Sequence, residues 1–409
     1  MSPKPLAVRS LTERFYHPEL DVLRFLAFFL IFLHHSMPHV PDFYTKLGVA
    51  PILASALAAL GATGAMGVQL FFLLSSYLVT ELLIRERATH GQIDLKAFYI
   101  RRILRIWPLY FAFLAFAWVM QWYLPGQHIG WRAGLAFTLF VGNWWVVFVG
   151  FPSSMIFHLW FISLQEQFYL FWPAMVRKLS QRGLLIAAAA MLALANLTRW
   201  YLAAHHTWET KIWCNTFVQL DGIALGIVLA VLLAGRAPRL APLLRAALFI
   251  GGFTCLVLAG YYFRIKFDPL TSPRVLLGYP VAALGATALF LATLREQAGA
   301  PFKPAVGLSG MASTLPTPAR SWRMWGWNSL NYLGRISYGL YVFHILGLMI
   351  SDYTVHDQQS SLGRYLLRNA VAFAATVALA ATSYRWLETP FLTLKQRFTR
   401  VLSRPAARA

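Results

Sequence analysis

The stretch LDVLRFLAFFLIFLHH, residues 20–35, is apolar along most of its length and polar near both ends. Asp21 and Arg24 stand near its start, and His34 and His35 close it. A charged side chain at the centre of a membrane helix costs about 2.5–3.5 kcal/mol on insertion scales, so such residues mark functional sites by default. The stretch therefore predicts a membrane-spanning helix that carries part of a functional site.

The composition of the whole chain is that of a membrane protein. Of its 409 residues, 58% are hydrophobic and 12% are charged, and soluble domains carry about twice that charge. In a soluble protein the net charge of +21 would suggest a nucleic-acid partner. Here basic loops that orient membrane helices explain it better, so we expect no nucleic acid. Cys214 and Cys255 lie in apolar segments and indicate neither a disulfide framework nor a metal site.

Long apolar runs and the distribution of basic residues predict the topology. Runs of spanning length begin near residues 20, 64, 106, 158, 183, 214, 246, 275, 330 and 366. If a further run at about 134–150 does not cross, most of the 36 Lys and Arg residues fall on the cytoplasmic side. We therefore predict an all-α, polytopic transmembrane bundle of about ten spanning helices. Residues 134–157 are then re-entrant or lie at the outer surface, and both termini are cytoplasmic.

Three segments describe the expected domain organisation. Residues 1–391 form one membrane domain, in which no segment outside the membrane is large enough for a soluble catalytic domain. Within it, the Gly- and Pro-rich residues 296–328 are expected to form a flexible cytoplasmic linker. Residues 392–409 are a basic cytoplasmic tail. Any chemistry must therefore take place within the bundle or at its surfaces.

The polar residues of the first helix share one face. His35 follows Arg24 by eleven residues, which is close to three turns and about 16 Å, whereas His34 points about 100° away. Asp21 and Arg24, three residues apart, also face the same side. A snorkelling ion pair and a core histidine with satisfied hydrogen bonds are the structural alternatives. The shared face favours a functional site in which His35 acts as a general base on a hydroxyl.

The segment FYIRRILRIWP, residues 98–108, places Arg101, Arg102 and Arg105 where cytoplasm meets membrane. Guanidinium groups bind phosphates through paired hydrogen bonds. A cluster that contacts lipid headgroups is the alternative, and the segment by itself favours it. Gly67 and Phe71 open the second apolar helix, where a glycine admits a ligand or a neighbouring helix, and helix packing is the simpler explanation.

A polar ribbon, HLWFISLQEQFY at residues 158–169, interrupts a later apolar run. Glu166 lies about two turns from His158, and a buried carboxylate needs a partner or a proton. Three roles fit it: pairing with a charge on the first helix, orienting His35, or carrying protons. A purely structural hydrogen-bond network is the alternative. Asp221, His344 and Glu388 are the other ionisable residues of interest within the membrane.

In their order and spacing these segments resemble the acyltransferase 3 family of integral membrane acyltransferases, over about residues 16–391. The resemblance rests on six stretches: Arg24 to His35, Gly67 with Phe71, and residues 98–108, 158–169, 332–344 and 388–390. It implies transfer of an acyl group, usually acetyl from cytoplasmic acetyl-CoA. The acceptor would be a hydroxyl of a glycan, a lipid-linked saccharide or a secondary metabolite, and the location the inner membrane of a bacterium.

The resemblance also assigns roles. Its catalytic residues would be His35, Arg24, Asp21 and Glu166, and its acetyl-CoA site would include Arg101, Arg102, Arg105, Gly67 and Phe71. Gln165 departs from the family, which usually has glutamate there. A proton-coupled transporter and an inactive scaffold are the alternative functions. The expected partners are acyl-CoA, a hydroxyl acceptor and membrane lipids, while the acceptor's identity and the oligomeric state stay open.

Overall fold

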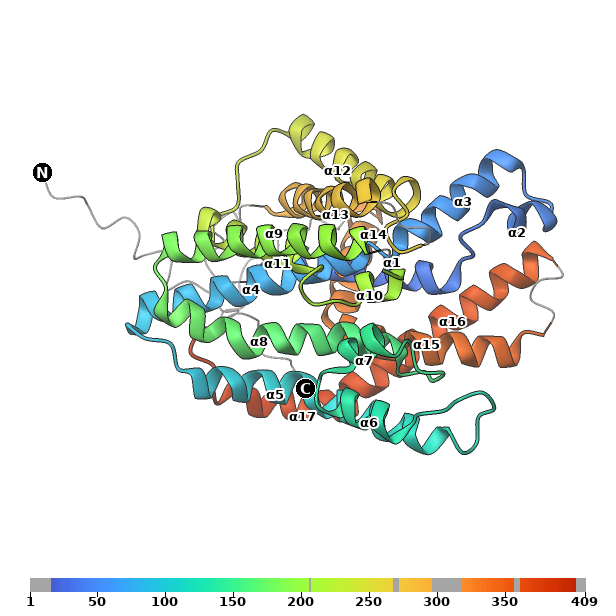
Figure 1. The fold of residues 1–409 in the computed structure, drawn as a ribbon, viewed down its shortest axis with the longest axis horizontal. Coiled ribbons are helices and arrows are strands. Elements are labelled where there is room, and N and C mark those ends of the chain that lie inside the picture. Colours follow the sequence, from blue (N-terminus) through green and yellow to red (C-terminus); the bar gives the residue numbers. More distant parts are fainter. Residues whose placement is uncertain (1–15, 206, 268–271, 296–317, 357–360, 402–409) are drawn as a thin grey trace, which may run out of the picture.

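The computed structural model describes residues 16–205, 207–267, 272–295, 318–356 and 361–401. Within these ranges the regular structure is helical and contains no strand (Figure 1). The helices are α1 (Pro18–Ser36), α2 (Pro41–Lys46), α3 (Pro51–Gly64), α4 (Gly67–His90), α5 (Leu95–Met120), α6 (Trp131–Thr138), α7 (Gly142–Phe148), α8 (Trp160–Lys178), α9 (Gln181–Ala204), α10 (Glu209–Trp213), α11 (Leu220–Leu233), α12 (Pro242–Val257), α13 (Ser272–Thr293), α14 (Pro318–Arg335), α15 (Ser337–Thr354), α16 (Leu362–Ser383) and α17 (Thr389–Gln396).

The all-α membrane bundle is confirmed, but the count of about ten spans is not. Within the described ranges six helical segments are long and apolar enough to cross a membrane, or seven if α14 and α15, bent by 81°, form one span. Each of the ten predicted runs does contribute to a helix. Some of these helices miss the criteria for a span because α11 has only 14 residues and α1 carries Glu19, Asp21 and Arg24.

Residues 134–157 form no span. Helices α6 and α7 have eight and seven residues, which gives each a length of about 10–12 Å, well short of a bilayer core. A buried polar network holds α7 to the bundle: Gln167 Nε2 donates to Asn143 Oδ1 at 2.8 Å, and Asn143 Nδ2 donates to Thr216 Oγ1 at 2.9 Å. The apolar run therefore folds back against the bundle, in agreement with the charge distribution.

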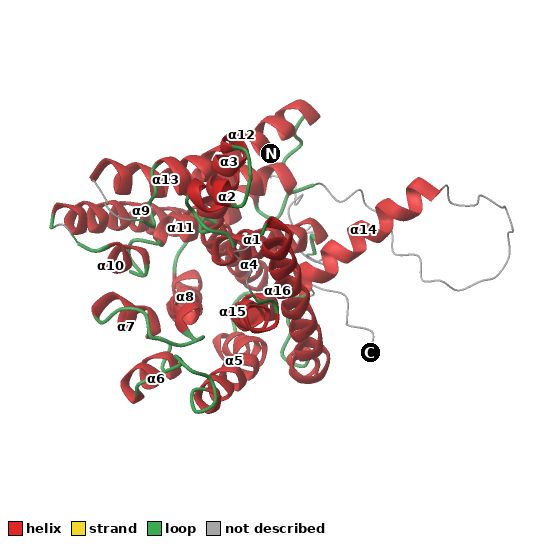
Figure 2. Cartoon of the chain, turned by 90° about the vertical axis from the view of Figure 1, so that its right-hand side faces the viewer, coloured by secondary structure: helices red, strands yellow, loops and turns green. Residues whose placement is uncertain are grey.

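Helix α1 lies in the middle of the bundle beside α4, and Figure 2 shows this from one end. Two glycines permit this close packing. A Cβ atom on Gly67 would lie 2.3 Å from the carbonyl oxygen of Ala27, and one on Gly334 would lie 1.9 Å from that of Asp21. Both distances are shorter than any tolerable contact, so α4 and α14 approach the backbone of α1 only because these side chains are missing.

Two of the loops predicted to be cytoplasmic, between α4 and α5 and between α8 and α9, lie at the same end of the bundle, at the left in Figure 1. There Arg87 Nη1 donates to the carbonyl oxygens of Val176 and Leu179, both at 2.6 Å, and ties α4 to the end of α8. The backbone N–H of Arg295 donates to Glu19 Oε1 at 3.0 Å and joins the end of α13 to the start of α1. We call this the inner end, and the opposite one the outer end.

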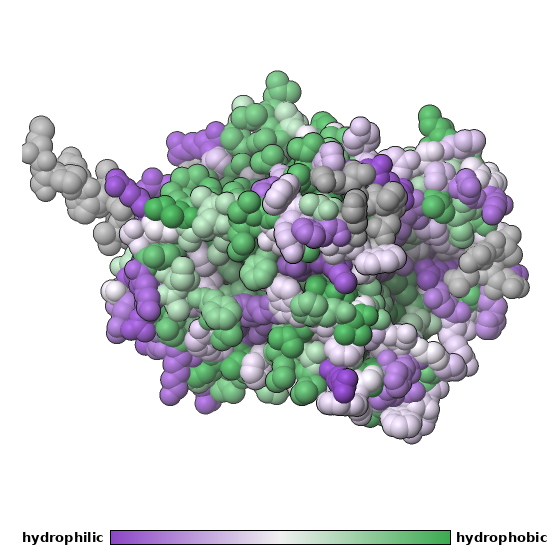
Figure 3. Space-filling model, in the orientation of Figure 1, coloured by the Kyte–Doolittle hydropathy of each residue, from purple (hydrophilic) through white to green (hydrophobic). Residues whose placement is uncertain are grey.

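The flank of the bundle is apolar. Figure 3 shows hydrophobic residues over much of the face formed by α5, α8 and α9, with hydrophilic residues towards both ends of the bundle. Phe171, Ile186 and Leu197 are each more than half exposed on this flank. Inside it, fully buried Arg199 of α9 pairs with Asp221 of α11. Asp221 is therefore held in a structural ion pair between two helices.

The predicted linker at residues 296–328 is partly wrong. Its residues 318–328 belong to α14, whose first residue, Pro318, has the fixed φ angle suited to a helix start. Residues 296–317 lie outside the described residues. The predicted basic tail, 392–409, is helical as far as Gln396, and its residues 402–409 also lie outside the described part.

Candidate active site

Helix α1 contributes to two cavities at its opposite ends. The inner cavity is strongly basic, and its charged lining residues are Asp21, Arg24, Glu86, Arg101, Arg102, Arg105, Lys395 and Arg400. The outer cavity is lined by His34, His35, Ser36, Met37, Pro38, His39, Phe43, Tyr365 and Arg368. The structure therefore places Arg24 and His35, which share a face of α1, in different cavities.

In the inner cavity, Asp21 and Arg24 form the predicted pair. Arg24 Nη1 donates to Asp21 Oδ1 at 2.6 Å, and the hydroxyl of Tyr16 donates to Asp21 Oδ2 at 3.2 Å. Asp21 is buried, with a relative exposure of 1%. Both carboxylate oxygens are thus engaged, and the Arg24 guanidinium is held in position at the cavity wall.

The arginines of α5 have different surroundings. The guanidinium of Arg101 is engaged by protein groups: it donates to Glu86 Oε2 at 3.0 Å and to the carbonyl oxygen of Phe398 at 2.7 Å. Arg102 stacks on Tyr169, and it has no hydrogen bond or ion pair with any other described residue. Arg105 also lines the cavity. Arg102 is therefore the α5 arginine with N–H groups available for an anionic ligand.

The C-terminal segment also forms part of this wall, which the sequence did not predict. Lys395 and Arg400 line the inner cavity, and Arg400 Nη2 lies 2.6 Å from Asp94 Oδ2. The backbone N–H of Ala97 and the charge of Arg400 lower the pKa of the Asp94 carboxyl, so it is ionised at neutral pH. The partners are 306 residues apart, and no local sequence signal indicates such a contact.

The deep part of the inner cavity is mostly apolar and aromatic. Phe71, Phe161 and Tyr341 line it, together with Ser75 and Gln165. Gln165 Nε2 donates to Ser75 Oγ at 2.5 Å. Phe71 thus lies where the resemblance implies a donor site, whereas Gly67 is not among the lining residues and packs against α1.

Glu166 is not brought together with the other candidate catalytic residues. Its Oε2 accepts a hydrogen bond from Trp107 Nε1 of α5 at 3.1 Å, and it lines neither cavity. The reason is helical geometry, because adjacent positions on α8 point about 100° apart. Gln165 therefore faces the inner cavity, and Glu166 faces α5.

At the outer end, hydrogen bonding separates the two adjacent histidines. Both ring nitrogens of His34 are engaged: Nδ1 lies 3.1 Å from the carbonyl oxygen of Gly61, and Nε2 lies 2.5 Å from Lys266 Nζ. Neither ring nitrogen of His35 has a hydrogen-bond partner among the described residues. Of the two histidines, His35 is thus the one whose ring nitrogens no described residue engages, and its catalytic role stays a prediction.

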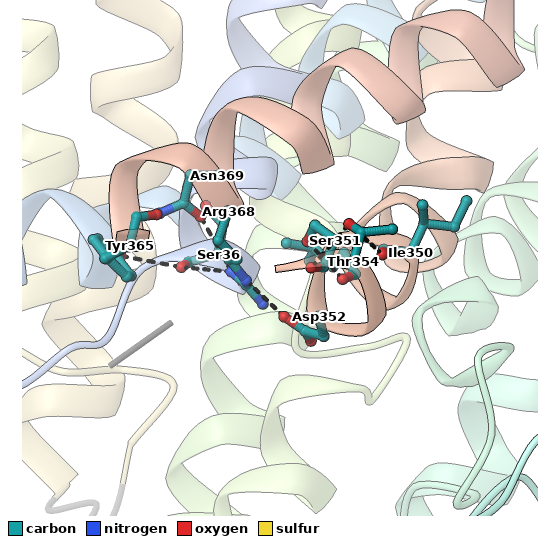
Figure 4. Close-up of polar contacts among 9 residues, drawn as sticks. Ser36, Ile350, Ser351, Asp352, Thr354, Tyr365, Arg368 and Asn369 are labelled. Carbon is teal, nitrogen blue, oxygen red and sulfur yellow. Dashed lines mark hydrogen bonds and ion pairs between the residues drawn. The ribbon is translucent and has the colours of Figure 1, made fainter. Parts of the chain in front are cut away.

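Helix α16 fixes the backbone beside His35. Figure 4 shows the hydroxyl of Tyr365 and Nη1 of Arg368 both donating to the carbonyl oxygen of Ser36, each at 3.2 Å. Arg368 Nε also donates to Asp352 Oδ1 of α15 at 2.7 Å. These contacts join the ends of α1, α15 and α16 around the outer cavity.

A thin layer of rings separates the two cavities. The ring of Tyr341, which lines the inner cavity, lies 5.5 Å from the ring of His344, and His344 lies 5.1 Å from His35. His158 lies 4.9 Å from His344. No group of three or more His, Cys, Asp or Glu in the described chain is arranged to hold a metal ion.

Comparison with known proteins identifies the family of the chain. A family model described as an acyltransferase domain matches residues 17–385. The chain belongs to the acyltransferase 3 family. The match covers all the residues discussed above except Tyr16 and those of the C-terminal segment after Arg385. No solved structure matches the chain.

Curated relatives of this acyltransferase 3 member are O-acetyltransferases. The peptidoglycan O-acetyltransferase OatA of Listeria monocytogenes is 26% identical over 402 residues, which are 92% of this chain and 56% of OatA. The putative peptidoglycan O-acetyltransferase YrhL of Bacillus subtilis is 25% identical over 81% of this chain and 51% of the length of YrhL. A putative O-acetyltransferase of Staphylococcus aureus is 24% identical over 80% of this chain and 52% of the length of that relative. The chain thus spans about half the length of the curated relatives it matches.

Proposed function

We propose that this chain transfers an acetyl group from acetyl-CoA, bound in the inner cavity, to a glycan hydroxyl that reaches His35 from the outer cavity. One observation carries the proposal. The central helix presents Arg24 to a basic cavity at one end, and at the other end it presents His35, whose ring nitrogens no described residue engages. The names of the relatives favour peptidoglycan as the acceptor.

The inner cavity has the chemistry of a coenzyme A site. Coenzyme A is a polyanion joined to a long, weakly polar arm. Arg102, Arg105 and Arg400 offer cations for its phosphates, and Phe71 and Phe161 offer an apolar slot for the arm. Because basic residues favour the cytoplasmic side, we place the inner end, and with it both termini, in the cytoplasm of a bacterium.

The proposed reaction is a proton-coupled acyl transfer. A ring nitrogen of His35 takes the proton of the acceptor hydroxyl, and the oxygen attacks the thioester carbonyl. The tetrahedral intermediate collapses, the C–S bond breaks, and the CoA sulfur takes up the proton held by His35, so that CoA leaves as the thiol and His35 is neutral again. Arg24 and Asp21 line the polar part of the donor path. Formation of an acyl-histidine at His35, followed by attack of the acceptor, is the two-step form of the same transfer.

Both forms require the thioester to reach the ring layer between the cavities. Arg24 and His35 are eleven residues, or about 16 Å, apart along α1. The arm of the donor must therefore extend from the phosphate-binding arginines past Phe71 to Tyr341 and His344. The acceptor then needs to enter only the outer cavity, which contains His35 itself.

The test uses the full chain purified in detergent, so that both cavities are accessible. The protein is incubated with acetyl-labelled acetyl-CoA and with peptidoglycan from which O-acetyl groups have been removed by mild base. Formation of base-labile label on the glycan supports the proposal. Uptake of a solute into liposomes without acyl-CoA, together with no labelled glycan, would instead indicate a transporter.

A further inference from the structure

We infer that His344 is a positioning residue for His35: its Nε2 accepts the N–H of the His35 ring and directs the other nitrogen of His35 into the outer cavity. The inference rests on the proposed function and adds a residue to it. His344 is fully buried on α15. Its environment determines which of its ring nitrogens carries a hydrogen.

The tautomer of His344 follows from its neighbours. Nδ1 lies 2.5 Å from the carbonyl oxygen of Tyr341, and a carbonyl oxygen accepts but cannot donate, so Nδ1 carries the hydrogen. In the neutral ring Nε2 is then a bare acceptor. Nε2 is buried and has no hydrogen-bond partner within the described chain. A buried acceptor without a donor is costly, so its presence needs an explanation.

His158 has the same arrangement with its nitrogens exchanged. Its Nε2 lies 3.1 Å from the carbonyl oxygen of Val342 and therefore carries the hydrogen, while its buried Nδ1 has no partner in the described part of the chain. The hydroxyl of Tyr341 donates to the carbonyl oxygen of His158 at 2.5 Å. These contacts hold the start of α8 against the middle of α15 beside His344.

His35 is the donor available to this pair. Its ring lies 5.1 Å from that of His344, and two imidazoles joined by an N–H···N bond have centroids about 5 Å apart. The present ring orientations do not make the bond, and the inference requires a rotation of the His35 ring at this separation. Hydrogen bonds of this kind often tighten only in the complex with substrate.

The hydrogen bond to His344 would determine which ring nitrogen of His35 acts as the base. With one nitrogen donating to His344, the other holds the lone pair that removes a proton from the acceptor hydroxyl. Once His35 is protonated, His344 continues to accept from the imidazolium and stabilises it. In other acyl-transfer sites a second residue orients the catalytic histidine and stabilises its protonated form. Here the neutral ring of His344 would do both.

Two substitutions separate this role from a purely structural one. In His344→Asn, the amide takes the place of Nδ1 and can donate to the Tyr341 carbonyl, but nothing replaces Nε2. In His344→Gln, the amide oxygen reaches the place of Nε2 and accepts from His35, but the bond to Tyr341 is lost. The Asn variant therefore keeps the structural contact and the Gln variant keeps the positioning contact.

We expect His344→Asn to lower kcat by about 100-fold with an unchanged KM for acetyl-CoA, and His344→Gln to stay within about tenfold of the unmodified protein. The assay is glycan acetylation from labelled acetyl-CoA by the full chain in detergent. The melting temperature of each variant shows whether it is folded. The reverse order, with Asn active and Gln inactive, overturns the inference, and so do two variants that keep full kcat. Failure of the unmodified protein to acetylate any glycan overturns the proposed function itself.

Discussion

The guanidinium of Arg102 lies over the ring of Tyr169, with its central carbon 4.5 Å from the ring centroid. The contact joins α5 to α8. A cation–π contact uses no N–H hydrogen bond, so the N–H groups of Arg102 can still bind an anion. Arg102 is thus oriented in the inner cavity without an acidic partner, whereas Arg101 is bound to Glu86.

Arg102→Ala should raise the KM for acetyl-CoA by about 10- to 100-fold and change kcat little. The estimate follows from the loss of charge-assisted hydrogen bonds worth about 1.5–3 kcal/mol. Initial rates of glycan acetylation at varied acetyl-CoA concentration measure it. Arg177→Ala is the matched control, because Arg177 is exposed on α8 and does not line the cavity. Equal KM values for the two variants would indicate that the arginines of α5 contact lipid headgroups and do not bind the donor.

Arg400→Ala should raise the KM for acetyl-CoA by about two- to fivefold, a small effect because the side chain of Arg400 is 38% exposed. Arg397→Ala is the control, since it removes the same charge from the same segment but Arg397 does not line the inner cavity. The changes in KM should also depend differently on salt: the change caused by Arg400→Ala should become smaller as ionic strength rises. Identical behaviour of the two variants would show that the tail acts only through its net charge.

Gly67→Ala should destabilise the protein by about 1–3 kcal/mol, because the new Cβ would lie 2.3 Å from a backbone oxygen of α1. Its melting temperature in detergent should fall, while the folded fraction keeps a normal KM for acetyl-CoA. Gly251→Ala on exposed α12 is the control, since a Cβ there meets nothing within 4 Å. A stable Gly67→Ala protein with a raised KM would instead support a direct role in donor binding.

Glu166→Gln should keep kcat within a few-fold of the unmodified protein. The amide oxygen of glutamine can still accept the hydrogen bond of Trp107, which lies 3.1 Å from the carboxylate. Steady-state acetylation rates test this directly. A loss of about 100-fold or more would show that Glu166 takes part in the chemistry despite facing α5.

The sequence predicts those features of the fold and site that depend on local periodicity. The spacing from Arg24 to His35 determines their shared face of α1, and the charge distribution indicates that residues 134–157 do not cross. The first inference depends only on the pitch of a helix, and the second on the excess of basic residues on the cytoplasmic side of a membrane.

Features that depend on contacts between distant segments could not be predicted. Arg102 and Arg101 are adjacent and chemically identical, and only the packing of Glu86 and Phe398 distinguishes them. His34 and His35 are likewise adjacent and chemically identical. A distant residue distinguishes them, because Lys266, which contacts His34, lies in a loop 232 residues away. Helical geometry separates Gln165 from Glu166, but which of the two faces the inner cavity depends on the rotation of α8 relative to its neighbours, and the sequence of α8 alone does not determine that rotation.

The most direct test of the central claim is acetyl transfer across a membrane. The full chain is reconstituted into sealed liposomes with de-O-acetylated peptidoglycan fragments trapped inside, and labelled acetyl-CoA is added outside. The account predicts base-labile label on the trapped fragments with the unmodified protein and none with His35→Ala. Label on trapped fragments at the same rate with His35→Ala, or transfer only when donor and glycan share one side, would contradict it.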